Sequence, residues 1–231
     1  MSTARVTRRD PATDRGRRTR SALVAAARGV FEERGFAATR MGDIATAANV
    51  SHGTVYTYFD TKEDILAAAV EDLIADLRES IRAVEIVDPV ARVAHANERY
   101  VAAYAAHARL MRVFEEVATT DAHFREILND LRRTHANRVA ASIRRLQAEG
   151  AALVDLPPEP TAAALCAMVE GYARHWFENG ASHDTQTAAG TLTMLWARAL
   201  GLPRVTATTA TPHAGETQIP RTAESAKQGG T

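Results

Sequence analysis

Hydrophobic residues recur along most of the chain at the spacing of an α-helix. Apolar positions three and four residues apart place their side chains on one face of a helix. No stretch shows the clean alternation of apolar and polar residues that is typical of a strand. We therefore predict an all-α protein of about nine helices.

Glycine, proline and capping residues divide this pattern into segments. The first predicted helix ends at Gly35, and two short helices follow within residues 39–59, with Ser51 as the N-cap of the second. Thr61 caps a fourth helix, and Asp64 three positions later completes a capping box. That helix is expected to run to about residue 84. Further helices are predicted at about 90–106, 108–119, 121–149, 160–179 and 184–200.

The two ends of the chain lack the helical pattern. Residues 1–18 are rich in arginine, and residues 203–231 are rich in Thr, Ala, Pro and Gly. Neither segment carries enough large apolar side chains to offset the entropy lost on ordering. We predict a flexible basic arm over residues 1–18 and a disordered tail over residues 203–231. Between them we expect a small domain over residues 19–64 and a larger helical domain over residues 65–202.

The charge of the chain is unevenly distributed, although its net value is zero. Residues 1–62 hold ten arginines and one lysine against six acidic residues, a net charge of +5, which leaves −5 for the rest. A basic front end suggests an anionic partner that only one domain contacts. The arginine-rich arm is consistent either with a solvated tail or with a contact in a DNA minor groove.

Several classes of protein are disfavoured by composition. The single cysteine, Cys166, cannot form an intramolecular disulfide or a thiolate metal cluster. The longest apolar run is about eight residues, against about 18 for a membrane span, and the N-terminus lacks the apolar region of a secretory signal. No glycine-rich phosphate loop or zinc spacing is present. We expect a cytoplasmic protein that is not an enzyme, with no catalytic residue, metal, cofactor or membrane partner.

The two short helices within residues 39–59 are typical of a helix-turn-helix unit, whose second helix enters the major groove of DNA. Val55 and Phe59, four residues apart, are expected to face inward. Hydroxyl, imidazole and glycine positions are left on the outer and N-terminal faces, and these groups suit phosphates and base edges. Tyr56 fits either a DNA contact or a core aromatic.

The segment VSHGTVYTYFDTKEDIL is the most specific part of the sequence. Through its aromatic pair and capped lysine it resembles the tetracycline-repressor (TetR) family of bacterial transcriptional regulators, from about residue 20 to residue 73. The resemblance implies base contacts by His52, Gly53 and Tyr56. It implies phosphate contacts by Thr54, Thr57, Tyr58 and Lys62, and Lys62 also begins a helix whose N-terminal amides favour a phosphate. Gly42 departs from the family, because a longer polar side chain is common there.

The resemblance also implies that the rest of the chain binds a ligand and forms a dimer. Aromatic, Met and His side chains recur on helical stripes that suit an apolar pocket with a few polar anchors, and ordinary core is the alternative. The residues expected to line the pocket are Tyr100, Tyr104, His107, Met111, Phe114, Phe124, Leu128, His135, Met168, Tyr172 and Trp176. Arg132 and Arg138 lie beside this face and would either anchor an acid group or face water. The expected dimer contacts, on the last helix, are Leu192, Leu195, Trp196 and Leu200.

Together these features predict a ligand-responsive repressor. It is expected to bind a palindromic double-stranded DNA operator as a homodimer and to be released by a small, apolar effector of unknown identity. The alternative of a helical adaptor protein leaves the basic front end unexplained.

Overall fold

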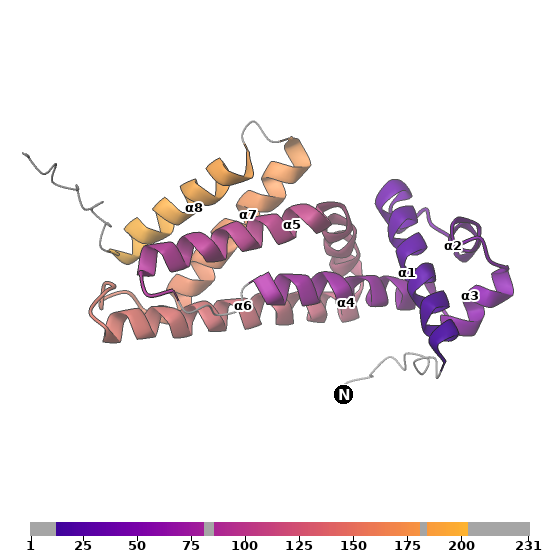
Figure 1. Cartoon of the computed structure of the whole chain (residues 1–231), viewed down its shortest axis with the longest axis horizontal. Coiled ribbons are helices and arrows are strands. Elements are labelled where there is room, and N and C mark those ends of the chain that lie inside the picture. The colour runs from indigo at the N-terminus through magenta and orange to yellow at the C-terminus, as the bar shows by residue number, and fades with distance from the viewer. Residues whose placement is uncertain (1–12, 81–85, 181–183, 203–231) are drawn as a thin grey trace, which may run out of the picture.

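The computed structural model describes residues 13–80, 86–180 and 184–202, and within these ranges the chain forms eight α-helices and no strand. The all-α prediction is confirmed. Three helices and the start of a fourth form a small unit at one end, and the remaining helices form an elongated larger body (Figure 1). The helices are α1 (Asp14–Arg34), α2 (Met41–Ala47), α3 (His52–Tyr58), α4 (Lys62–Ser80), α5 (Pro89–Thr120), α6 (Ala122–Ala148), α7 (Pro158–Asn179) and α8 (Thr185–Leu200).

Helix α1 begins at Asp14, inside the segment 1–18 that was expected to be a flexible arm. The Thr13 hydroxyl accepts a hydrogen bond from the Gly16 amide at 3.1 Å, and Arg17 pairs with Asp14 one turn earlier. These local contacts satisfy the first turn, so the helix forms there without a large apolar residue. The arm prediction is therefore wrong for residues 14–18. Residues 1–12 and the tail 203–231 lie outside the described residues.

Helix α4 joins the two parts of the molecule. At its start the Thr61 amide donates to the Asp64 carboxylate at 2.9 Å, and the Asp64 amide donates to the Thr61 hydroxyl at 3.2 Å, which confirms the capping box. The helix packs on both α1 and α5. The domain boundary expected after residue 64 thus falls within a helix rather than in a linker.

Helix α5 is continuous over the two segments expected as separate helices at 90–106 and 108–119. Residues 105–108 read Ala-Ala-His-Ala, without glycine or proline, and alanine is the best helix former. The His107 ring is buried there and contacts the Asp76 carboxylate of α4 at 2.7 Å. The described chain therefore has eight helices, one fewer than expected.

The core of the larger body lies around α5, which packs against α4, α6, α7 and α8. Helices α6 and α7 also pack closely on each other. Within the described ranges, no helix is long and apolar enough to cross a membrane.

Candidate nucleic-acid interface and ligand cavity

The surface formed by α3 carries most of the residues expected to contact DNA. The Ser51 hydroxyl caps this helix by accepting from the Thr54 amide at 3.2 Å. Val55 and Phe59 are 0% and 2% exposed, and they anchor the helix in the core of the small unit as predicted. Because these residues fix the inner face, the N-terminal turn and outer face of α3 are turned to solvent.

The expected base contacts are all exposed. His52, Gly53 and Tyr56 lie on this outer surface, and the side chain of Tyr56 is 41% exposed, so the core alternative for Tyr56 is wrong. The rings of His52 and Tyr56 meet edge to face with centroids 5.0 Å apart. A Cβ atom built on Gly42 of α2 would lie 3.8 Å from the His52 ring, so α2 passes close to this pair.

The expected phosphate contacts divide into two groups. Thr57 is exposed, and Thr54 and Tyr58 are half-buried at the edge of the same surface. Lys62 is different, because its ammonium group donates to the carbonyls of Phe36, Ala37 and Thr39 at 2.8, 3.4 and 3.0 Å.

Lys62 also lies 4.4 Å from the centroid of the Phe36 ring. An ammonium group has three donors, and the three carbonyls use all of them. The structure therefore assigns Lys62 to holding the α1–α2 loop against the start of α4, and the predicted phosphate contact is not supported.

Positive charge lies beside α3 on the first turns of α1. The guanidinium of Arg20 lies 5.3 Å from the centroid of the Phe59 ring, which places the start of α1 next to the end of α3. Arg15, Arg17 and Arg18 are exposed on these turns. The small unit thus presents cations next to an exposed polar helix, an arrangement that suits a phosphate backbone.

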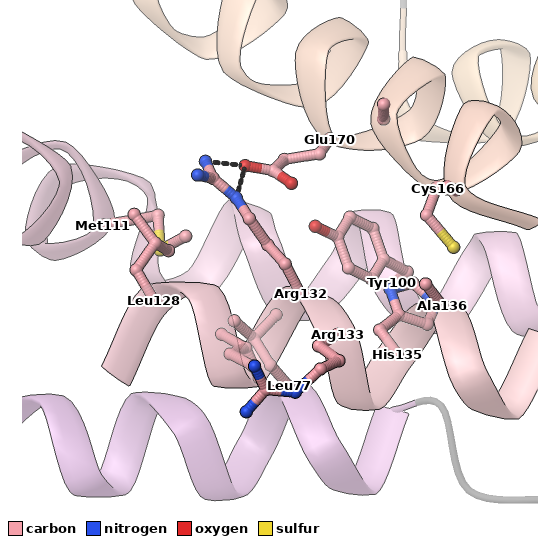
Figure 2. A pocket seen from close by; sticks show the side chains of 13 residues that line it. Leu77, Tyr100, Met111, Leu128, Arg132, Arg133, His135, Ala136, Cys166 and Glu170 are labelled. Atoms are coloured by element: carbon pink, nitrogen blue, oxygen red, sulfur yellow. Dashed lines mark hydrogen bonds and ion pairs between the residues drawn. The ribbon is translucent and has the colours of Figure 1, made fainter. Parts of the chain in front are cut away.

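A cavity of about 300 Å³ lies in the larger body, between α4, α5, α6 and α7 (Figure 2). Four of the expected pocket residues line it, namely Tyr100, Met111, Leu128 and His135. The other residues that line it are Leu77, Leu131, Arg132, Arg133, Ala136, Ala163, Cys166, Ala167 and Glu170.

Seven of the expected pocket residues do not line this cavity. Phe114 and Phe124 are fully buried and pack against each other in the core, at 6.2 Å between ring centroids. Tyr104 stacks on Phe177, and His107 contacts Asp76. Tyr172 and Trp176 pack against each other, and Met168 is a half-buried residue that also packs on the core. For these residues the alternative of ordinary core is the better interpretation.

An ion pair between α6 and α7 forms one end of the cavity. The Nε of Arg132 donates to Glu170 at 2.8 Å, and a second nitrogen of the same guanidinium lies 3.5 Å from Glu115. Glu170 was missed, because it lies 38 positions from Arg132 and no local pattern links the two residues. The position of Arg132 beside the predicted apolar face was the only available signal.

Apart from Arg133, the other polar groups of the cavity are uncharged near neutral pH. Burial lowers the pKa of His135 to about 4, with Glu170 opposing the shift and Arg138 adding to it. Burial raises the pKa of the Cys166 thiol to about 12, and burial together with Glu170 raises the pKa of Tyr100. Within the described ranges, no cluster of three or more His, Cys, Asp or Glu side chains could hold a metal ion.

The dimer contacts expected on α8 fall on two different faces. Leu192, Trp196 and Leu200 are only 1%, 7% and 1% exposed, because they pack inside the single chain. They have little surface left for a second chain, so the prediction is wrong for these three residues. Leu195 is 46% exposed, and its neighbour Met194 is 50% exposed.

Comparison with known families agrees with this division of the chain. The family model described as "Bacterial regulatory proteins, tetR family" matches residues 23–69, which cover the small unit and the start of α4. The model described as "Tetracyclin repressor-like, C-terminal domain" matches residues 87–200. The chain belongs to the TetR family of transcriptional regulators. Its helix-turn-helix is therefore a DNA-binding element.

Individual relatives support the same assignment. The HTH-type transcriptional regulator EthR of Mycolicibacterium smegmatis is 29% identical over 181 residues, which cover 74% of this chain and 82% of EthR. The HTH-type transcriptional regulator TtgR of Pseudomonas putida is 27% identical over 172 residues, or 68% of this chain and 80% of TtgR. These relatives are named as regulators and not as enzymes, as expected for this chain.

A solved structure shows the same fold over most of the chain. The SmeT–triclosan complex superposes with a TM-score of 0.65 at 20% identity, covering 88% of this chain and 100% of SmeT. At this identity the likeness establishes the TetR fold and leaves the ligand of this chain to be argued from its own residues.

Proposed function

We propose that this TetR-family chain reads an operator with the exposed surface of α3. His52, Gly53 and Tyr56 would contact base edges in the major groove, and Thr54, Thr57 and Tyr58 would contact phosphates. The observation that carries the proposal is the exposed polar face of α3, held by the buried Val55 and Phe59. As a DNA-binding regulator of a bacterial family, the protein would act in the cytoplasm.

We also propose that the protein acts as a homodimer. Two adjacent exposed apolar side chains on α8, Met194 and Leu195, offer a surface that a second copy would cover. A two-fold symmetric dimer presents two copies of α3 about one helical turn of DNA apart, roughly 34–36 Å. The operator would accordingly be a palindrome.

The cavity supports regulation by a small effector. Helix α4 lines it through Leu77 and begins at Lys62, only a few residues after α3 ends. A ligand that binds more tightly when α4 lies in a DNA-incompetent position would shift the population and release the operator. The occupied SmeT relative, solved with triclosan, shows that a protein of this fold accepts a small molecule.

Selection of bound duplexes from a randomised DNA pool tests the proposed function. We expect enrichment of a palindrome that binds two chains, measured by sedimentation of the complex. Tyr56→Ala should weaken binding to that duplex by about 1–3 kcal/mol for each half-site, the value of one good base contact. Arg145→Met, a change at the far end of α6, is the matched control and should have no effect. Failure to enrich any sequence, or one chain per duplex, would contradict the proposal.

A further inference from the structure

The cavity between α4, α5, α6 and α7 has a chemistry that selects among small molecules. We propose that it takes an uncharged, mainly apolar molecule with one hydroxyl or carbonyl group, held by the Tyr100 hydroxyl, and that it rejects carboxylates. This inference rests on the proposed function, in which the cavity is the effector site.

The walls of the cavity are mostly apolar. Leu77, Met111, Leu128 and Leu131 contribute large side chains from three helices, and the remaining apolar lining consists of alanines. An apolar ligand body gains free energy from leaving water for such a site, at about 25 cal/mol for each Å² that becomes buried. The α7 side is lined mainly by small residues, Ala163, Cys166 and Ala167, whereas α6 contributes the longer side chains.

Tyr100 is the polar group best placed to orient a ligand. Its ring stacks on His135 with centroids 5.4 Å apart and planes at 22°. Figure 2 shows the hydroxyl directed along the cavity toward the end formed by Arg132 and Glu170. The hydroxyl keeps its proton, because burial raises its pKa, so it can donate a hydrogen bond to a ligand oxygen. His135 is neutral and Cys166 is a thiol, so neither adds a charge.

The two charged side chains at the end of the cavity already neutralise each other. Arg132 lies 2.8 Å from one carboxylate, Glu170, and 3.5 Å from a second, Glu115. The side chains of these two glutamates are only 16% and 13% exposed. A ligand carboxylate would have to displace Glu170 from Arg132 and leave a largely buried anion without its partner, which is strongly unfavourable.

The remaining cation of the lining does not offer an anion site. Arg133 pairs with Asp130 at 2.8 Å, and its side chain is 68% exposed, so water screens its charge. An uncharged ligand needs no such partner and can use the Tyr100 hydroxyl alone.

A more open polar depression adjoins the cavity and suggests the competing ligand class. Arg132 and Leu128 line both, and Arg112, Arg125 and Arg174 line the depression. An amphiphile could place an anionic head there. Two of these arginines are already engaged, because Arg125 donates to the carbonyls of Ala118 and Thr119 and Arg174 lies 3.8 Å from Glu115. The observations therefore favour the uncharged class.

Matched pairs of probes test the proposal on the full chain without DNA. 2-Naphthol and 2-naphthoate share one ring system, and 1-decanol and decanoate share one alkyl chain, while only the acids are charged at pH 7. We expect calorimetric titration to show that the uncharged member of at least one pair binds at least tenfold more tightly than its acid.

Two tyrosine variants locate the binding site. Tyr100→Phe should weaken the uncharged probe roughly two- to tenfold, the effect of one hydrogen bond. Tyr104→Phe removes a hydroxyl from the same helix outside the cavity and should leave affinity unchanged. Three results would each overturn the inference. They are tighter binding of the acids, no binding by either uncharged probe, and equal effects of the two variants.

The inference and the proposed function fail in different experiments. If the probes behave as expected but no duplex is enriched, the proposed function is wrong and the chemistry of the cavity stands. If a palindrome is enriched but the acids bind more tightly, only the inference about the ligand is wrong.

Discussion

Lys62 holds the loop between α1 and α2 against the start of α4. Its ammonium group binds three carbonyls of the α1–α2 loop and lies over the ring of Phe36. Replacing it with methionine keeps an apolar side chain of similar length and removes every donor. We predict that Lys62→Met destabilises the small unit and leaves the number of phosphate contacts unchanged.

The magnitude follows from the contacts that are lost. Hydrogen bonds to a charged group contribute about 1.5–3 kcal/mol each, and the cation–ring contact adds about 0.5–1 kcal/mol at a partly exposed site. The three bonds share one half-buried ammonium group, so their contributions are not additive. We expect a loss of about 2 kcal/mol in the free energy of unfolding, nearer to one strong bond than to three.

Two assays separate the structural role from a phosphate contact. Urea unfolding at fixed protein concentration should show the loss of stability for Lys62→Met and none for Arg145→Met, which removes an exposed cation far from α3. The slope of log affinity against log salt, measured on the selected operator, should not change. If Lys62 binds a phosphate, a dimer loses two contacts, the slope falls by about 1.8, and stability is retained. That result would refute our assignment.

Four further predictions concern the rest of the fold. Burial holds the pKa of His135 near 4 in the folded chain, below its ordinary 6.5. Between these two pH values the unfolded chain binds more protons than the folded chain, so the free energy of unfolding falls as the pH drops from 6.5 to 4. His135→Gln should remove this component, on the order of 3 kcal/mol, from the difference in unfolding free energy between pH 7 and pH 4. Gly29 lies at an exposed helical position, and a Cβ atom added there would have no atom of another part of the chain within 4 Å. Gly29→Ala should therefore raise the thermal midpoint, because alanine favours the helix by about 1 kcal/mol over glycine. Gly201→Ala should lower that midpoint, because φ is +66° and the new Cβ would lie 2.6 Å from a side-chain carbon of Leu153. If Met194 and Leu195 form the proposed dimer surface, Leu195→Glu should give monomers in light-scattering measurements without loss of helix content. Trp196→Ala should instead cost about 3–5 kcal/mol of stability. The reverse pattern would show that our assignment of the α8 faces is wrong.

The small unit could be predicted from sequence because its determinants are local. Ser51 caps α3 from three residues away, and Val55 and Phe59 lie one turn apart on its inner face. Such contacts need no knowledge of another helix. The role of Lys62 could not be predicted in this way, since its partners lie 23 to 26 positions earlier in the loop before α2.

The larger body was harder to predict because its contacts depend on how helices cross. Leu195 and Trp196 are neighbours and both apolar, and only the position of α8 against α5 decides which one is buried. The cavity has the same origin, because Arg132 and Glu170 meet only when α6 and α7 pack in one register. Periodicity located the stripe that holds Tyr100 and Met111, but it could not separate lining residues from core.

The central claim is that the exposed surface of α3 reads the operator, and a second DNA selection with His52→Gln tests it most directly. We predict that the preferred bases change at symmetric positions in both half-sites while the rest of the palindrome stays the same. Enrichment of the original sequence with unchanged affinity would show that His52 does not contact bases and would contradict our account of the interface.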